Sequence, residues 1–255
     1  MPTQKWSRRE TLAAFALYCR TPFGRLHARN QDIIALAARL GRTASAVAMK
    51  CCNLASLDDT HQARGVKGLR KVSAVDRSLW ADFQTDPEAI SFEAAKVLAA
   101  VESRPVVPPL HEPEIAQLEG KERERVTRIR VNQYFFRDLV LASYNESCAV
   151  CTLPIRQLLV GAHIVPWSSD SSLRMKPRNG ICLCGTHDLA FERGLLRVQS
   201  DLVIRISIPD ESRDSPPVND WLIRYEGGKI HLPHRWCPDS KLLARKLTLL
   251  IDDSK

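Results

Sequence analysis

Hydrophobic and polar positions alternate with a helical period in the first third of the chain. Apolar residues recur every three or four positions over Trp6–Tyr18 and again over Gln31–Leu40. Ser7, with Glu10 three residues later, has the spacing of a capping box at the start of the first helix, and Gly41 follows the second helix where a C-terminal glycine is favoured. The pattern therefore predicts two amphipathic helices separated by a turn, and the inward residues of the second helix are Ile33, Ile34, Leu36, Ala37 and Leu40.

A third helix is predicted to begin at Thr43 or Ser45 and to run to about Leu54. We expect it to bury Val47 and Met49. Its exposed positions are expected to be Ser45, Lys50 and Asn53.

The rest of the chain changes from a helical to a mixed pattern. Further helices are predicted at Ser73–Phe83, Pro87–Val101, Gly120–Tyr144, 186–193 and Ser240–Leu250. Strands are predicted at Leu158–Trp167, Arg178–Cys184 and Leu202–Ile208, the last beside the first two, with a hairpin of Trp221–Tyr225 and Lys229–Leu232 around Gly227 and Gly228. The fold class is therefore α+β, with a helical N-terminal domain.

Domain boundaries follow from these patterns. We predict a helical domain at 1–72, a helical connector at 73–103, a Pro-rich linker at 104–119, and a second domain at 120–255.

Composition places the chain among soluble globular proteins. Hydrophobic residues make up 44% of it, and no apolar run is long enough to span a membrane. The first residues lack the apolar core of a signal peptide, so we expect a cytoplasmic protein. In that compartment clustered cysteines indicate metal ligands rather than disulfides.

Positive charge is concentrated at the N-terminal end. Residues 1–72 hold thirteen Lys and Arg against four Asp and Glu, an excess of nine, whereas the whole chain carries +8. The basic, Gly-containing segment Ala63–Lys71 belongs to this region and could follow a DNA backbone. A polyanionic partner is indicated, and a solvated basic face is the alternative.

Metal-binding residue types cluster between Cys148 and Leu196. This stretch holds four of the eight cysteines and two of the seven histidines. It contains Cys-x-x-Cys, a histidine after an apolar run, Asn-Gly, Cys-x-Cys and His-Asp. The spacing indicates a small metal site.

Residues 120–205 resemble the HNH endonuclease family in its restriction-type branch, on GKERERVTRIRVNQYFFRDLVLASYN, LLVGAHIVPW and NGICLCGTHDLAFERGLL. The resemblance implies a ββα-metal finger in which His163 is the general base and Asn179 holds the loop between the strands. It further implies a catalytic Mg²⁺ or Mn²⁺ bound by Asp188 or His187. Ala162 stands where many members have a second metal ligand.

The same resemblance implies a structural zinc bound by Cys148, Cys151, Cys184 and His187. With zinc present, Asp188 is left to hold the catalytic cation; without zinc, His187 becomes the catalytic ligand. The other cysteines, including Cys182, are expected in the core.

Residues 5–55 resemble the Myb/SANT-like branch of the helix-turn-helix motif, on WSRRETL and IIALAARLGRTASAVAMKCCNL. A protein-binding three-helix bundle is the alternative. The DNA contacts expected from this module and from the long helix are Arg39, Arg42, Lys50, Arg128 and Arg130.

Together these features predict a metal-dependent DNA endonuclease of bacterial or phage restriction or defence. Cutting both strands would need two nicking events or a homodimer. The alternative is a non-catalytic DNA-binding regulator with a structural zinc finger.

Overall fold

The computed structural model describes residues 5–63, 65, 72–107 and 115–252. The chain divides into two compact units at Leu139 and Val140, a boundary inside helix α8 (Gly120–Ser143). The predicted linker residues 108–114 lie outside the described residues, as does most of the basic segment Ala63–Lys71. Each unit is described by itself.

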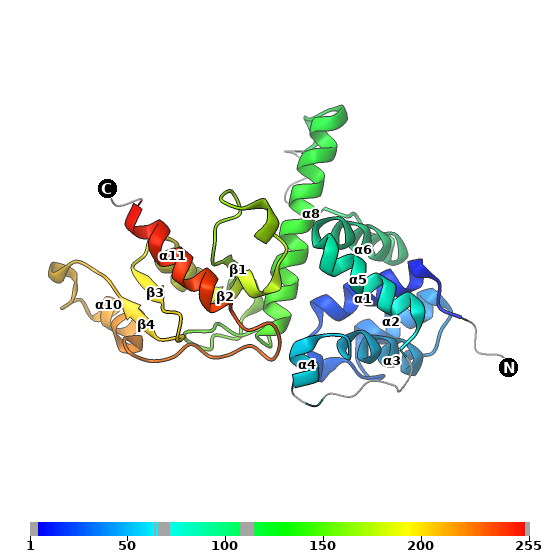
Figure 1. Cartoon of the computed structure of the whole chain (residues 1–255), viewed down its shortest axis with the longest axis horizontal. Coiled ribbons are helices and arrows are strands. Elements are labelled where there is room, and N and C mark those ends of the chain that lie inside the picture. Colours follow the sequence, from blue (N-terminus) through cyan, green and yellow to red (C-terminus); the bar gives the residue numbers. More distant parts are fainter. Residues whose placement is uncertain (1–4, 64, 66–71, 108–114, 253–255) are drawn as a thin grey trace. The chain divides into compact units, whose positions relative to one another are not determined.

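Unit 1 is built from helices around a central helix (Figure 1). Helix α1 packs against α3, α5 and α6, and its side chains from Thr11 to Cys19 are all buried. The described helices of this unit, besides α8, are α1 (Arg8–Arg20), α2 (Gln31–Leu40), α3 (Ala44–Ala55), α4 (Asp59–Ala63), α5 (Ala74–Thr85) and α6 (Pro87–Glu102). All but α4 were predicted.

Local sequence signals fix the ends of these helices. Ser7 and Glu10 form the predicted capping box at α1, and the hydroxyl of Thr43 accepts a hydrogen bond from the Ala46 amide at the start of α3. Gly41 ends α2 with φ of +63°, a conformation that glycine adopts without a steric penalty.

The inward faces of α2 and α3 differ from the prediction. Ile34 is 40% exposed and Met49 is 44% exposed, although both were expected to be buried. Lys50 and Asn53, which were expected to be exposed, are both buried. Helix α3 therefore turns its polar positions toward the neighbouring helices of the unit.

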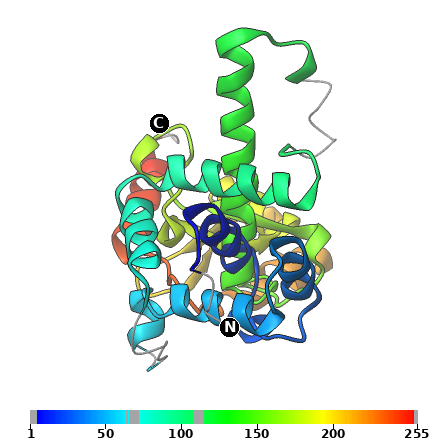
Figure 2. The same ribbon diagram turned by 90° about the vertical axis from the view of Figure 1, so that its right-hand side faces the viewer.

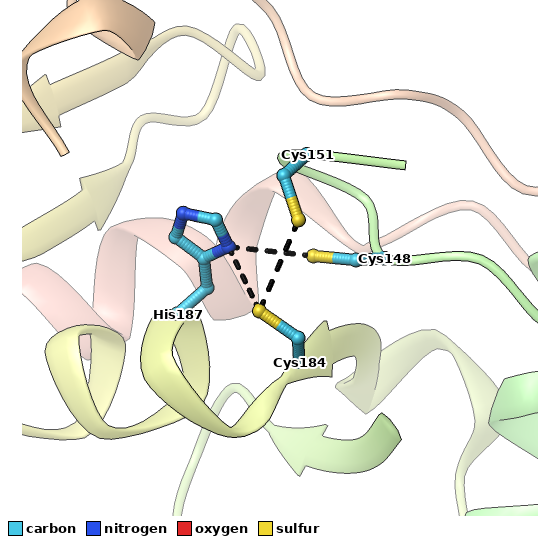
Figure 3. A group of neighbouring side chains, drawn as sticks. All are labelled: Cys148, Cys151, Cys184 and His187. Carbon is cyan, nitrogen blue, oxygen red and sulfur yellow. Dashed lines mark hydrogen bonds between the residues drawn. The ribbon is translucent and has the colours of Figure 1, made fainter. Parts of the chain in front are cut away.

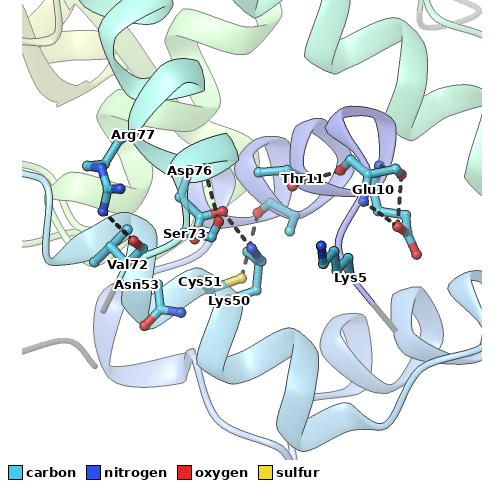
Figure 4. Close-up of polar contacts among 12 residues, drawn as sticks. Lys5, Glu10, Thr11, Lys50, Cys51, Asn53, Val72, Ser73, Asp76 and Arg77 are labelled. Carbon is cyan, nitrogen blue, oxygen red and sulfur yellow. Dashed lines mark hydrogen bonds and ion pairs between the residues drawn. The ribbon is translucent and has the colours of Figure 1, made fainter. Parts of the chain in front are cut away.

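Lys50 is buried because α5 supplies its counter-ion (Figure 4). Its Nζ lies 2.5 Å from Oδ1 of Asp76, whose side chain is fully buried. The ammonium also lies 4.7 Å from the centre of the Trp6 ring. An ion pair in a dry environment is sensitive to the loss of one partner, because the remaining charge keeps its desolvation cost.

Unit 2 contains a β-hairpin followed by a helix, as predicted. Strand β1 (Leu159–His163) pairs antiparallel with β2 (Gly180–Cys184), so that Leu159 faces Cys184 and His163 faces Gly180. Helix α9 (Gly185–Glu192) follows directly and packs on both strands. Strand β1 is shorter than the predicted Leu158–Trp167, because the chain leaves the sheet after His163.

A second small sheet replaces part of the predicted C-terminal pattern. Strand β4 (Ile204–Ile206) pairs with β3 (Leu196–Val198) and not with the β1–β2 hairpin. The predicted hairpin around Gly227 is wrong: α10 (Pro216–Trp221) and the 3₁₀ turn Ile223–Tyr225 are helical. The Gly227 amide instead donates to the Ile204 carbonyl, which places this turn against β4.

The last helix, α11 (Ser240–Asp252), ties the parts of unit 2 together. Arg245 forms an ion pair of 2.8 Å with Asp170, in the loop that follows β1. The Lys246 ammonium lies 5.2 Å from the ring centre of Phe191 on α9. Among the described residues no helix is long and apolar enough to cross a membrane.

We predict that Lys50→Ala lowers the free energy of unfolding by about 3–5 kcal/mol, because it leaves the Asp76 carboxylate buried without its cation. The double variant Lys50→Met/Asp76→Leu should recover most of this loss. Urea titration followed by circular dichroism measures both, and Lys50→Ala as stable as the wild type would contradict the prediction.

Candidate metal centre and catalytic site

Three cysteines and one histidine converge in unit 2 (Figure 3). The ligand atoms of Cys148, Cys151, Cys184 and His187 all lie within 4.8 Å of one another. Nδ1 of His187 is 3.1 Å from the Cys184 sulfur and 3.5 Å from the Cys148 sulfur, and the sulfurs of Cys151 and Cys184 are 3.9 Å apart.

Backbone hydrogen bonds and the ends of β2 and α9 position these side chains. Cys148 and Cys151 lie on a tight turn in which the Thr152 amide donates to the Cys148 carbonyl. This turn is held to β2, because the Ala149 amide donates to the Cys182 carbonyl at 2.7 Å. Cys184 ends β2 and His187 lies in the first turn of α9.

A hydrogen bond fixes the tautomer of His187. Its Nε2 lies 2.8 Å from the Trp221 carbonyl oxygen, which can only accept, so Nε2 carries the proton and Nδ1 presents its lone pair to the sulfurs. A metal-binding histidine is commonly oriented by such a bond from its other nitrogen.

The donor set fits zinc. Sulfur atoms bonded at about 2.3 Å to a tetrahedral Zn²⁺ are about 3.8 Å apart, close to the observed separation of Cys151 and Cys184. The hydrogen bond with Cys148 raises the pKa of Cys184 to about 11, and burial raises that of Cys151. Zinc binds thiolates, so loading this site must release protons.

His163 ends β1 and lies half-buried beside the loop between the strands. Its Nε2 is 2.9 Å from the carbonyl oxygen of Arg174, and its ring meets the edge of Trp167 at 5.4 Å. The carbonyl requires a proton on Nε2, so the basic lone pair of the neutral ring is on Nδ1. Burial lowers the pKa of His163 below its ordinary value, and the bond to Arg174 opposes this shift.

Asn179 joins the two ends of that loop. Its amide oxygen accepts from the Val165 amide at 2.9 Å, and its amide nitrogen donates to the carbonyls of Val165 and Leu173 at 3.1 and 3.2 Å. Its own carbonyl accepts from the Ile164 amide. These partners are the chain neighbours of His163 and of Arg174, so the fully buried Asn179 fixes the geometry of their hydrogen bond.

His163 and the metal centre lie at opposite ends of the hairpin. His163 pairs with Gly180 and Leu159 pairs with Cys184, so four residues of strand separate the two sites. At about 3.3 Å per residue this is about 13 Å. The geometry therefore separates the Cys₃His centre from any chemistry at His163.

Asp188 follows His187 on α9 and is half-buried. Burial raises its pKa to about 6, the nearby Glu192 adds to this, and Lys246 opposes it. Among the described residues the Cys₃His cluster is the one group of three or more potential ligands close enough to share an ion. A cation on Asp188 would therefore have few protein ligands, which Mg²⁺ tolerates because it keeps several waters.

The candidate DNA contacts fall into two groups. Arg42 and Lys50 were expected to contact a phosphate backbone, and the structure corrects this prediction, because both side chains are held in ion pairs. The Arg42 side chain is 8% exposed and pairs with Glu10 at 2.7 Å, and Lys50 pairs with Asp76. The pairing with Arg42 lowers the pKa of Glu10 to about 2. The remaining candidates have surface exposure: Arg39 and Arg128 are exposed and Arg130 is half-exposed.

Several contributors to the site leave no signal in the sequence. The carbonyls of Arg174 and Trp221 orient the two histidines, and backbone oxygens leave no signature in residue type. Lys246, which approaches Asp188, was part of a predicted amphipathic helix whose partner could not be named. Cys182 is buried in the core, as predicted.

A comparison with protein families gives the class of this site. Residues 148–199, which are 52 of the 255 residues, match the family model described as HNH endonuclease. This segment is therefore similar to the HNH endonuclease family, and it holds both histidines, Asn179 and the four residues of the Cys₃His cluster. Comparisons with curated proteins and with solved structures found no match. The HNH match does not extend to residues 5–55, so the Myb/SANT-like module stays a prediction.

We predict close to one zinc per chain by elemental analysis of the purified protein. Cys184→Ser should lose most of the metal, because it removes one of four ligands, and should lower the melting temperature. Cys237→Ser is the matched control, since Cys237 lies outside the cluster and should retain zinc. Equal zinc content in the two variants would exclude the proposed ligand set.

Proposed function

We propose that this protein is a metal-dependent endonuclease that hydrolyses DNA phosphodiester bonds, with His163 as the general base. The supporting observation is the hydrogen bond from Nε2 of His163 to the Arg174 carbonyl, inside the HNH-matched segment. A structural zinc finger needs no such histidine, because His163 is not one of the four clustered ligands.

In this proposal the Nδ1 lone pair of His163 removes a proton from the attacking water. Once the ring is protonated, Nε2 continues to donate to the Arg174 carbonyl, so that bond stabilises the imidazolium that forms. Because the lowered pKa keeps the ring neutral near pH 7, the resting state is ready to accept a proton.

The chemical step is an in-line displacement at phosphorus. The oxygen of water forms a bond to phosphorus as the bond from phosphorus to the 3′-oxygen breaks, and the water proton moves to His163. Protonation of the departing oxygen leaves 3′-hydroxyl and 5′-phosphate ends. A divalent cation such as Mg²⁺ or Mn²⁺, held by Asp188, would neutralise charge on the phosphate and on the departing oxygen.

In this proposal Asn179 and the zinc centre have structural roles and take no direct part in the chemical step. Asn179 keeps the loop closed, so that the His163 ring holds one orientation. In this proposal His187 supplies a zinc ligand, and Asp188, the next residue on α9, supplies the cation ligand.

The biological role of the proposed nuclease is inferred from the resemblance to the restriction-type branch of the HNH family. One such site cuts one strand, so cutting a duplex requires two events or two copies of the chain. We propose bacterial or phage restriction or defence as the setting, on the resemblance to the restriction-type branch, with DNA as the partner and the cytoplasm as the location.

A DNA-binding regulator with a structural zinc finger is the second candidate. It is favoured by the absence, among the described residues, of a second group of three potential metal ligands. The two candidates differ in whether DNA is cut, and the following experiment separates them.

We predict that the wild-type protein nicks supercoiled plasmid when Mg²⁺ or Mn²⁺ is added. His163→Ala should reduce the rate at least 100-fold, because general-base catalysis contributes about 10²–10⁴-fold. His231→Ala, which changes an exposed histidine in the same unit, should be unaffected. Gel analysis after zinc quantification measures the rates; no cutting by zinc-loaded wild type would favour the regulator.

We predict that the acid limb of the kcat/KM profile has its midpoint below pH 6.5. The sign follows from the base, which acts when neutral and whose lowered pKa keeps it neutral to a lower pH. Saturating Mn²⁺ should be used, because the metal competes with protons at Asp188. A midpoint above pH 6.5 would contradict the role of burial at His163.

A further inference from the structure

A basic groove lies within unit 1, where the first turns of α8 pass α6. Its volume is about 440 Å³. Figures 1 and 2 show α8 crossing α6 and extending beyond it. The groove is lined by Phe92 and Lys96 of α6, by Val106, and by Arg123, Glu124, Thr127 and Arg128 of α8.

The groove carries positive charge that the described residues do not neutralise. Lys96, Arg123 and Arg128 face one carboxylate, Glu124, and none of the three cations forms an ion pair within the described part of the chain. Four other basic side chains of unit 1 are paired with acids: Arg8 with Asp82, Arg20 with Glu102, Arg42 with Glu10 and Lys50 with Asp76. Concentrated unpaired cations in a hollow favour an anionic ligand.

Phe92 holds two of these cations in place. The Lys96 ammonium lies 5.4 Å from its ring centre and the Arg128 guanidinium lies 5.1 Å from it. The ring packs against a small apolar cluster formed by Val107, Ile115 and Val131. Because two cations lie over its ring, Phe92 keeps positive charge in the groove. The groove is therefore better suited to bind a charged backbone than to stack with a base.

We propose that this groove binds the phosphodiester backbone of the nucleic acid that the HNH domain cuts, an inference that rests on the proposed function. Arg123 and Arg128 are five residues apart on α8, or about 7.5 Å along the helix axis. One strand of a duplex places a phosphate about every 3.4 Å along its axis, so the two arginines span about two phosphates. Thr127 adds a hydroxyl donor between them.

The test is DNA binding measured by fluorescence anisotropy with a labelled duplex and no added Mg²⁺ or Mn²⁺, so that binding is separated from cutting. Arg123→Gln should weaken binding severalfold. Arg125→Gln is its matched control: it removes the same charge two residues away, from a side chain that pairs with Glu122 and does not line the groove, and it should change affinity by less than twofold. Equal weakening by the two variants would overturn the proposal.

A triple variant tests the groove as a unit. Lys96→Gln/Arg123→Gln/Arg128→Gln should bind at least 10-fold more weakly, and its slope of log affinity against log salt should be shallower by about 2–3, or about 0.9 for each lost phosphate contact. The charge-preserving pair Lys96→Arg/Arg128→Lys should bind like the wild type, and circular dichroism should show that all variants are folded. A folded triple variant with wild-type affinity and salt slope would overturn the proposal.

Two further experiments distinguish backbone binding from small-phosphate binding, and DNA binding from DNA cutting. If millimolar inorganic phosphate or a mononucleotide displaces the duplex at matched ionic strength, the groove is a small-phosphate site and the backbone assignment fails. His163→Ala should bind DNA normally and not cut it, whereas the triple variant should still nick at high protein concentration in low salt. Weak binding by the triple variant with no cutting by the wild type would support the groove and refute the nuclease.

Discussion

The amide of Asn179 is the contact on which the arrangement around His163 depends. One buried side chain joins Val165, two residues after His163, to Leu173, which precedes the residue whose carbonyl holds the imidazole. A loop of this length has many conformations, and three side-chain hydrogen bonds in a dry interior select one of them. The orientation of the His163 ring is therefore a property of the closed loop, since no contact within β1 alone would fix it.

The β1–β2 hairpin separates two kinds of chemistry that share one short segment. At one end Cys184 and His187 join the Cys148–Cys151 turn in a centre whose donors suit zinc; at the other end His163 faces the loop. A metal bound by the Cys₃His centre would hold three parts of unit 2 together: the β1–β2 hairpin, the Cys148–Cys151 turn and α9. Each of the two described sheets in this unit has two strands. α11 adds a second constraint through its ion pair with Asp170. A zinc ion in the Cys₃His centre would thus stabilise the same frame as α11, and the chemistry proposed for His163 uses that frame.

Charge in unit 1 shows why a basic sequence is not the same as a basic surface. Arg42 and Lys50 contribute to the positive excess of residues 1–72, yet both are held in ion pairs close to the Trp6 ring. Lys96, Arg123 and Arg128, which form no ion pair among the described residues, lie on α6 and α8, outside residues 1–72. The groove beside Phe92 therefore replaces Arg42 and Lys50 as a candidate contact with nucleic acid, and the exposed Arg39 remains one.

The sequence by itself determined the features that depend on near neighbours in the chain. Caps at Ser7 and Thr43, the turn at Gly41, the long helix α8 and the order of strand, loop, strand and helix were all predictable, because each is set by contacts within a few residues. The resemblance to the HNH family also predicted the Cys₃His cluster. Tertiary structure alone decided the burial of Lys50, whose counter-ion is 26 residues away, and the pairing of β4 with β3 in place of the β1–β2 hairpin. It also supplied the carbonyls that fix both histidines, because distant backbone groups meet only when the chain has folded.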